Sequence, residues 1–284
     1  MGVSSLEKLI QNINNLQTLP TIYSSISSAL ADPLVTPDKL SKIISVDQVS
    51  STKILKVANS PFYGFRGKID TISQAVLFLG FNEIKNIIFA LSVVNSFGKN
   101  KSVMNFKPVD LWAHSIGVGI ATRMIGSALG EKSLENYFLA GIIHDIGKIL
   151  FIEFIPDEYA KVLRLVSQSN CSVKQAEKEI LSLDHCRAGQ LLAEKWKLPL
   201  NLYDVIIHHH SGSNGKEPSR MLASVHIANI FVRALNLGNA GDNLVLQPNF
   251  DAWNIVKLPK GFFASVKKNL IEDFNHTASL MLFE

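Results

Sequence analysis

The apolar positions along this chain recur mostly at spacings of three and four residues, which is the repeat of an amphipathic helix. Strict alternation of apolar and polar residues over six or more positions is hard to find. Capping residues mark where helices begin. In Thr36-Pro37-Asp38 the threonine suits an N-cap, and the proline suits the first helical position. The pattern therefore predicts an all-α fold.

The first third of the chain contains a predicted helix from Thr71 to Leu79 that Gly80 ends, and a following helix that Asn82 caps. Further predicted helices lie near Val109–Leu129, Leu134–Glu153, Asp157–Ser167, Ser172–Leu181, His185–Trp196, Leu200–His209, Pro218–Leu235 and Pro259–Phe274. Residues 238–251 form the longest stretch without a clear pattern. No internal repeat is found.

The segment 98–106 (GKNKSVMNF) is polar and basic and has no helical period. We expect it to separate an N-terminal helical lobe, residues 1–105, from a second lobe with a C-terminal extension, residues 106–284. The eight histidines follow this division, because residues 1–105 contain none and seven lie between positions 114 and 226. The first lobe is therefore expected to serve packing and partner binding, and the second to carry any chemistry.

Composition excludes several classes of protein. A chain with 47% hydrophobic and only 18% charged residues is not disordered. Two cysteines among 284 residues form no disulfide framework, so we expect a cytoplasmic protein. A net charge of +4 without a basic stripe does not predict nucleic-acid binding. The apolar run Tyr137–Phe154 holds His144, Asp145 and Lys148 in its middle. Since a charge at a bilayer centre costs about 3 kcal/mol, no membrane segment is expected.

The pair His144-Asp145 stands out because it interrupts this apolar run. A buried charge is costly unless it is paired or bound. Asp145 could simply cap a helix or pair with Lys148, or the pair could bind a metal, since imidazole and carboxylate groups suit zinc, iron and other transition metals. His114 lies four residues after Asp110 and shares its helix face, which alone is weak evidence.

A run of three histidines, His208 to His210, ends one predicted helix. Successive helical residues point about 100° apart, so at most two of the three face one site unless the helix ends there. The following sequence, Ser211 to Gly215, indicates that it does end. Cys186 adjoins His185 and is predicted to be a buried, unreactive thiol.

Several of these motifs together resemble known families. The segment Gly141–Lys148 (GIIHDIGK) resembles the HD superfamily of metal-dependent phosphohydrolases, and the order of the histidines resembles its HD-GYP branch of cyclic-dinucleotide phosphodiesterases. Ala58–Gly64 (ANSPFYG) and Leu111–Ser115 (LWAHS) resemble the HDOD domain, the HD-related output domain of bacterial signalling. The resemblance covers roughly Leu16 to Gly238. It implies an HDOD-type multi-helical fold with an N-terminal helical lobe and an HD-like C-terminal lobe.

The resemblance also implies a site for one or two divalent ions of iron, manganese or zinc. The implied metal ligands are His114, His144, Asp145, His185, His209, His210 and Asn229. Asn229 stands where HD enzymes place their last aspartate. Asp145 is the implied catalytic and bridging carboxylate. For Lys148 two roles are open: contact with a substrate phosphate as a point charge, or an ion pair with Asp145.

Two functions remain open at this point. One is a signal-transduction output module that acts through protein interaction and has a structural or regulatory metal pocket. The other is an active phosphohydrolase or cyclic-dinucleotide phosphodiesterase, which the nearly complete ligand set favours. Asn229 removes one negative charge, and no Gly-Tyr-Pro element follows His210; both features favour the first function and leave enzymatic activity uncertain.

The expected partner is an unidentified signalling protein, with a nucleotide or cyclic dinucleotide as the alternative ligand. The sequence contains no receiver or GGDEF-type domain, so we expect the signal to arrive through a separate protein or ligand. Nucleic acid and membrane are not expected partners.

Overall fold

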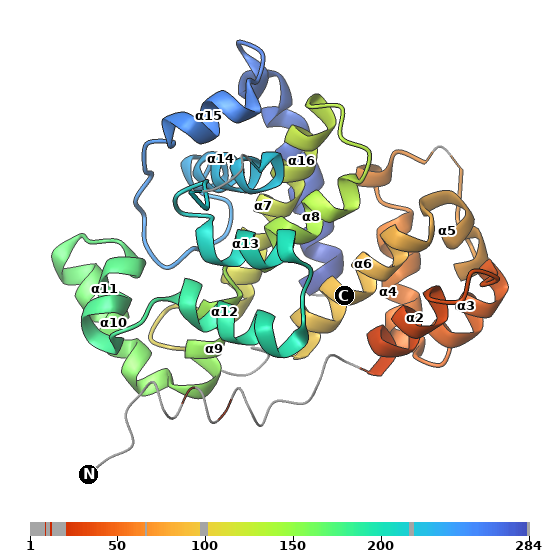
Figure 1. Ribbon diagram of the computed structural model, residues 1–284, viewed down its shortest axis with the longest axis horizontal. Helices are drawn as coiled ribbons and strands as arrows, with labels where there is room; N and C mark the ends of the chain where they lie inside the picture. Colours follow the sequence, from red (N-terminus) through yellow and green to blue (C-terminus); the bar gives the residue numbers. More distant parts are fainter. Residues whose placement is uncertain are drawn as a thin grey trace. The chain divides into compact units, whose positions relative to one another are not determined.

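The computed structural model describes residues 9, 12, 21–65, 67–96, 102–215 and 219–282, which form helices joined by loops (Figure 1). Within these residues no β-strand occurs, and an isolated antiparallel bridge joins Val103 and Phe106. The prediction of an all-α fold is confirmed.

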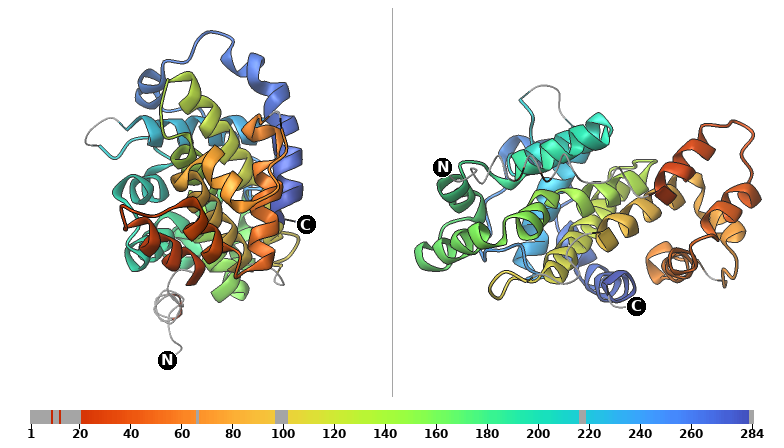
Figure 2. Two further views of the ribbon diagram at one scale, coloured as in Figure 1. Left: turned by 90° about the vertical axis from the view of Figure 1, so that its right-hand side faces the viewer. Right: turned by 90° about the horizontal axis from the view of Figure 1, so that it is seen from below.

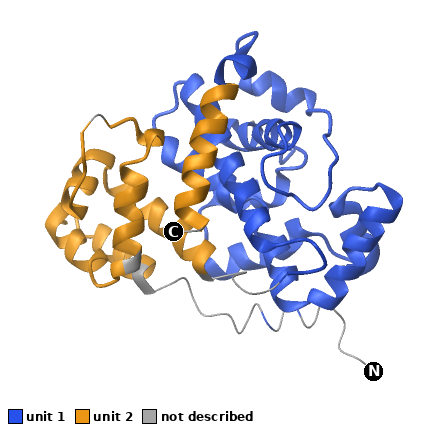
Figure 3. Cartoon of the chain, turned by 180° about the vertical axis from the view of Figure 1, so that it is seen from behind, with its two compact units in different colours: residues 1–16, 97–266 blue, residues 17–96, 267–284 orange. Residues whose placement is uncertain are grey.

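The chain divides into two compact units, coloured in Figure 3. The first unit contains residues 97–266 and the second contains residues 17–96 together with residues 267–284. The division differs from the predicted lobes at the C-terminal end, where the extension groups with the helices of the first third of the chain. Apolar residues such as Leu270, Ala278 and Met281 on one face predict that a helix is packed. They do not predict which other helices it packs against.

The second unit is built from short helices with well-defined caps. Its helices are α2 (Thr21–Leu30), α3 (Pro37–Ile44), α4 (Gln48–Ala58), α5 (Ile72–Leu79) and α6 (Phe81–Ser96). Thr36 caps α3 as predicted, and Thr71 caps α5 in a capping box with Gln74. The predicted cap at Asn82 is wrong, because α6 already begins at Phe81. Gly80 ends α5 at a φ of 87° and accepts the first bond of α6 from the Ile84 amide, so one glycine serves both helices.

Asn59 fixes the loop that follows α4. Its side-chain amide donates to the carbonyls of Leu55 and Ile69, at 2.8 Å and 2.7 Å. Its side-chain oxygen accepts from the Ile69 amide at 2.8 Å. Phe62, in the short turn Pro61–Tyr63, is buried. The motif around Asn59 therefore closes a loop upon itself.

Among the described residues, no single helix is both long and apolar enough to cross a membrane. The pair α5 and α6 meets the length and composition test together, with a bend of 115° between the two helices.

The first unit holds the remaining helices, except that it contains only residues 262–266 of the last one. They are α7 (Pro108–Ala128), α8 (Leu134–Ile143), α9 (Ile146–Phe154), α10 (Pro156–Ser169), α11 (Val173–Leu181), α12 (His185–Trp196), α13 (Leu200–His208), α14 (Arg220–Ala234), α15 (Phe250–Val256) and α16 (Phe262–Leu282), the last of which continues into the second unit. Helix α7 packs against α8 and α14, and the turned views keep α7 beside α8 (Figure 2). Gly119 and Gly141 permit this approach, since a Cβ at Gly141 would lie 2.5 Å from Gly119 Cα.

The predicted helix Leu134–Glu153 is wrong as a single element. It is broken at His144-Asp145 into α8 and α9, and the Asp145 backbone (φ −102°, ψ 16°) leaves the helical region there. Asp145 occupies the N-cap position of α9, but its carboxylate does not cap the helix. Periodicity missed the break because both halves are equally apolar.

Three smaller differences concern the C-terminal third. Helix α14 begins at Arg220 with Ser219 as its N-cap, and Pro218 lies outside the described residues. The unpatterned stretch ends in α15, whose seven residues are too few to show a period. Helix α16 continues past the predicted end at Phe274 to Leu282.

Candidate metal centre

The predicted ligands converge at one place in the first unit. They come from α7 (His114), the break between α8 and α9 (His144, Asp145), the start of α12 (His185), the end of α13 (His209, His210) and the middle of α14 (Asn229). All are buried except His210, which is partly exposed. The close packing of α9 on α12 is part of the reason. A Cβ at Gly147 would lie only 1.9 Å from the His185 carbonyl oxygen, so only glycine lets His185 come this near to Asp145.

The Asp145 carboxylate lies in the middle of this group. Its Oδ1 atom is 3.3 Å from the Nε2 atoms of both His185 and His209. Its Oδ2 atom is 3.3 Å from His144 Nε2 and 2.7 Å from Lys148 Nζ. Each carboxylate oxygen therefore faces a different set of side chains.

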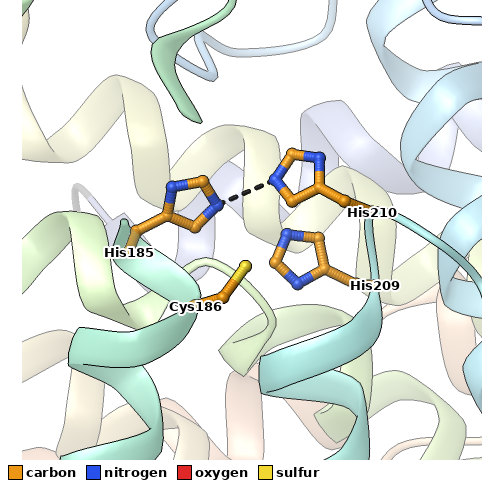
Figure 4. A group of neighbouring side chains, drawn as sticks. All are labelled: His185, Cys186, His209 and His210. Carbon is orange, nitrogen blue, oxygen red and sulfur yellow. Dashed lines mark hydrogen bonds between the residues drawn. The ribbon is translucent and has the colours of Figure 1, made fainter. Parts of the chain in front are cut away.

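The Oδ1 side is drawn in Figure 4, where the rings of His185 and His210 point toward each other above His209. The Nε2 atoms of His185 and His210 are 2.9 Å apart. Cys186 belongs to the same group, whose potential ligand atoms all lie within 4.8 Å of one another. Burial raises the pKa of Cys186 to about 12, so this side chain is a buried thiol, as predicted.

The histidines present Nε2 to the centre because their other ring nitrogen is occupied. His144 Nδ1 lies 2.7 Å from the Gly141 carbonyl, and His209 Nδ1 lies 3.2 Å from the carbonyls of Val205 and Ile206. A carbonyl only accepts, so these Nδ1 atoms carry the proton and Nε2 keeps a lone pair. His114 differs, since its Nε2 atom is 3.1 Å from Asn229 Oδ1.

The donor atoms fit a metal ion. His144 Nε2, His209 Nε2 and Asp145 Oδ1 are buried and have no hydrogen-bond partner, and an unpaired buried polar atom is costly. Ligands at about 2.0–2.1 Å from a tetrahedral metal lie about 3.3 Å from one another, as these donors do. Nitrogen and carboxylate donors suit zinc, iron and manganese.

The protonation states also suit a cation. Burial lowers the pKa of His114, His185 and His210, and lowers the pKa of His209 to about 4, so the four rings are neutral. Burial alone would raise the pKa of Asp145, but the Lys148 ammonium group outweighs it and holds that pKa well below its usual range. The centre therefore presents one carboxylate among neutral imidazoles.

The model of the HDOD domain family matches residues 16–212, more than half of the chain. This chain belongs to the HDOD family. The match includes the histidines from His114 to His210. It ends at residue 212, so Asn229 and the segment 236–243 come from the part of the chain beyond it.

The chain is also similar to solved structures and to a curated relative. An HDOD domain protein with unknown function from Geobacter sulfurreducens is 25% identical with a TM-score of 0.79, covering 96% of this chain and 97% of its own. A provisionally named phosphohydrolase from Shewanella amazonensis SB2B shares the fold at 21% identity and a TM-score of 0.75, covering 96% of this chain and 98% of its own. An uncharacterized protein of Treponema pallidum (strain Nichols) is 23% identical over 230 residues, which are 80% of this chain but 44% of that protein. The chain thus spans less than half the length of this relative.

Lys148 is engaged in this HDOD protein. Its ammonium group donates to Asp145 Oδ2 at 2.7 Å and to the Ala240 carbonyl at 3.0 Å, and the side chain is buried. Of the two roles left open for Lys148, the ion pair with Asp145 is the one present. Lys148 therefore neutralises the carboxylate and shares Oδ2 with any ion on that side.

Sequence reasoning missed Glu177. Its Oε2 atom accepts from His185 Nδ1 at 2.5 Å and from the His185 amide at 2.8 Å. A signal was present in the sequence, because Val173, Glu177 and Leu181 repeat every four residues along α11, which puts a carboxylate on an apolar face. His226, by contrast, connects backbone groups, donating to the His209 carbonyl and accepting from the Asn249 amide, both at 2.9 Å.

A cavity of about 530 Å³ adjoins the centre on the His114 side. It is bordered by His114, Arg233 and the segment 236–243, which belongs to the stretch without a sequence pattern. Gly238 crosses so close to α7 that a Cβ there would lie 2.1 Å from the His114 amide nitrogen. Arg233 is held by an ion pair with Asp242 and donates to the Leu244 carbonyl at 2.8 Å. The unpatterned stretch therefore forms a wall of the cavity.

Proposed function

We propose that this HDOD protein is a signal-transduction module whose buried centre binds a divalent metal ion with a structural or regulatory role. The observation that carries the proposal is the set of unpaired buried atoms, His144 Nε2, His209 Nε2 and Asp145 Oδ1. Buried ring nitrogens and a carboxylate oxygen held without partners are destabilising in a metal-free fold. A bound cation would satisfy the unpaired atoms that face it.

The centre offers two positions. His185, His209 and His210 with Asp145 Oδ1 would hold an ion on one side. His114, His144 and Asp145 Oδ2 form the other group, where Asn229 replaces a carboxylate and Lys148 occupies Oδ2. We infer that the first position is the stronger one, because Asp145 Oδ1 is unpaired there whereas Lys148 already occupies Oδ2. A bound divalent ion would supply Lewis acidity.

Metal content and affinity test this proposal. Protein purified without a His tag should contain stoichiometric zinc, iron or manganese, and a chelator should lower its unfolding midpoint. A ligand that binds only the folded state stabilises it by about 2.7 kcal/mol at a hundredfold excess over Kd. His209→Gln should abolish this difference. His276→Gln, a change at an exposed histidine on α16, should preserve it. An unchanged midpoint with and without chelator would refute metal binding.

A specific observation also favours a second candidate, a metal-dependent phosphohydrolase or cyclic-dinucleotide phosphodiesterase. The cavity beside His114 has the size of a small-ligand pocket, which ranges from about 300 to 1,000 Å³. However, Arg233 is already paired with Asp242, Lys148 is paired with Asp145, and the Gly-Tyr-Pro element is absent. Neither basic side chain is thus free for a phosphate.

Turnover decides between the two candidates. The protein should show no metal-dependent hydrolysis of an aryl phosphodiester or of cyclic dinucleotides with manganese, iron or zinc added in turn. Robust turnover would refute the proposal of a signalling module and support the phosphohydrolase. For the module we propose a cytoplasmic location and a separate signalling protein as partner.

A further inference from the structure

His185 differs from the other histidines of the centre in what holds its outer nitrogen. His144 and His209 present Nδ1 to backbone carbonyls, which are neutral acceptors. His185 presents Nδ1 to the Glu177 carboxylate at 2.5 Å. This contact is shorter than the Nδ1 contacts of His144 and His209, which are 2.7 Å and 3.2 Å long. The ring of His185 is therefore fixed more firmly than those of its neighbours.

Glu177 lies on α11 and His185 begins α12. Both carboxyl oxygens of Glu177 accept hydrogen bonds. The Oε2 atom also accepts from the His185 amide at 2.8 Å, and the Tyr159 hydroxyl of α10 donates to Oε1 at 3.3 Å. Glu177 is completely buried, with 0% of its surface exposed. Three contacts thus fix the carboxylate where no water reaches it.

This arrangement determines which atom His185 offers to the centre. With Nδ1 bonded to Glu177, Nε2 faces Asp145 Oδ1 at 3.3 Å and His210 Nε2 at 2.9 Å. A carboxylate in the interior is costly for folding alone, and an apolar residue would suit this face of α11 better. A carboxylate behind a metal-binding histidine orients the ring and raises its basicity, which strengthens the metal bond.

We propose that Glu177 is a positioning residue of the metal centre, holding His185 Nε2 toward the ion bound by Asp145 Oδ1. The inference rests on the metal binding proposed above. It predicts that Glu177, which is outside the ligand set, controls the affinity of the His185 position while contributing nothing favourable to the stability of the metal-free fold.

Glu177→Gln tests the role because it keeps the shape and removes the charge. The expected result is a 10- to 100-fold increase in Kd for zinc, measured by competition with a chromophoric chelator. The metal-free variant should unfold at the wild-type temperature or above it, since burial disfavours a charged carboxylate at this position and the amide is uncharged. Glu179→Gln is the matched control, because it makes the same change at an exposed position of the same helix, and it should bind zinc as the wild type does.

The outcomes separate the two proposals. If the wild type binds no metal, the proposed function fails and this inference fails with it. If the wild type binds zinc and Glu177→Gln binds it equally well, the centre stands and the role of Glu177 is wrong. A merely structural Glu177 would instead lower the metal-free unfolding temperature in Glu177→Gln.

A second variant covers the case in which Glu177→Gln does not fold. Glu177→Asp keeps the charge but withdraws it by one methylene from His185 Nδ1. Weakened zinc binding in this variant supports the proposal that Glu177 positions His185, and wild-type affinity overturns it.

Discussion

Asn59 and Asp145 each stand just beyond the end of a helix, in different units, and each lies in a motif that the sequence singles out. The polar atoms of Asn59 are all used inside the protein, by Leu55 and Ile69. Asp145 Oδ1 instead faces the Nε2 atoms of His185 and His209 at 3.3 Å without a hydrogen bond. The first motif closes upon itself, whereas the second is left open.

The difference separates a folding device from a binding site. A polar group that is satisfied within the fold fixes a loop and needs nothing further. A group of buried donors that face one another without bonds is costly, and the cost is removed when a ligand arrives. The Asn59 and Asp145 motifs should therefore respond differently to mutation, to pH and to metal.

The largest effect is expected at Asp145. Asp145→Ala removes the central carboxylate and leaves the buried Lys148 without its charged partner, so stability should fall by about 3–5 kcal/mol. The double variant Asp145→Ala with Lys148→Met removes the unpaired charge and should recover most of this loss. Neither variant should bind metal. Denaturant unfolding and zinc competition measure both, and metal binding by the double variant would contradict a central role for Asp145.

Acid should destabilise the metal-free protein through the buried histidines around Asp145. The pKa of His209 is about 4 in the fold and about 6.5 in an unfolded chain. As the pH falls from about 6.5 to 4, the unfolded chain takes up a proton that the buried ring refuses, so stability falls, by up to about 3 kcal/mol for this residue.

Other titratable groups of the centre also contribute to the change of stability with pH. His114, His185 and His210 act in the same direction as His209, because burial lowers each pKa. Glu177 acts in the opposite direction, because burial raises its pKa and favours the fold at low pH. Asp145 acts in the same direction as the histidines, because its pKa is lowered, so we expect the net change to be a loss. Unfolding of chelator-treated protein across this range checks the sign, and His209→Gln should flatten the slope.

Asn59→Ala should affect stability alone. It removes three hydrogen bonds that fix the Asn59–Ile69 loop, which costs about 1–3 kcal/mol. Zinc affinity should be unchanged. A weaker affinity in this variant would show that the closed motif also serves the centre.

The smallest effect is expected at Asn229. Asn229→Asp restores a charge beside His114 and should tighten metal binding on that side, by less than the loss caused by Glu177→Gln, because Lys148 already occupies Asp145 Oδ2. Phosphodiester hydrolysis should remain absent. Turnover in this variant would indicate an enzyme disabled at one ligand, and the turnover assay on both forms distinguishes the two cases.

The sequence by itself determined the helical class and most helix positions, and it predicted the candidate ligands from His114 to Asn229 that the structure brings together. Helix periodicity and capping are local, so Thr36 and Thr71 mark their helices without reference to the rest of the chain. The order of the histidines, compared with known families, predicted the candidate ligands.

Only the tertiary structure showed the break at Asp145, the Glu177 carboxylate behind His185, the wall formed by residues 236–243, and the grouping of residues 267–282 with the second unit. Each depends on contacts between residues distant in the sequence. Gly147 illustrates the reason: it is an ordinary helical glycine in the sequence, and only the His185 carbonyl 1.9 Å from its missing Cβ explains why no other residue fits.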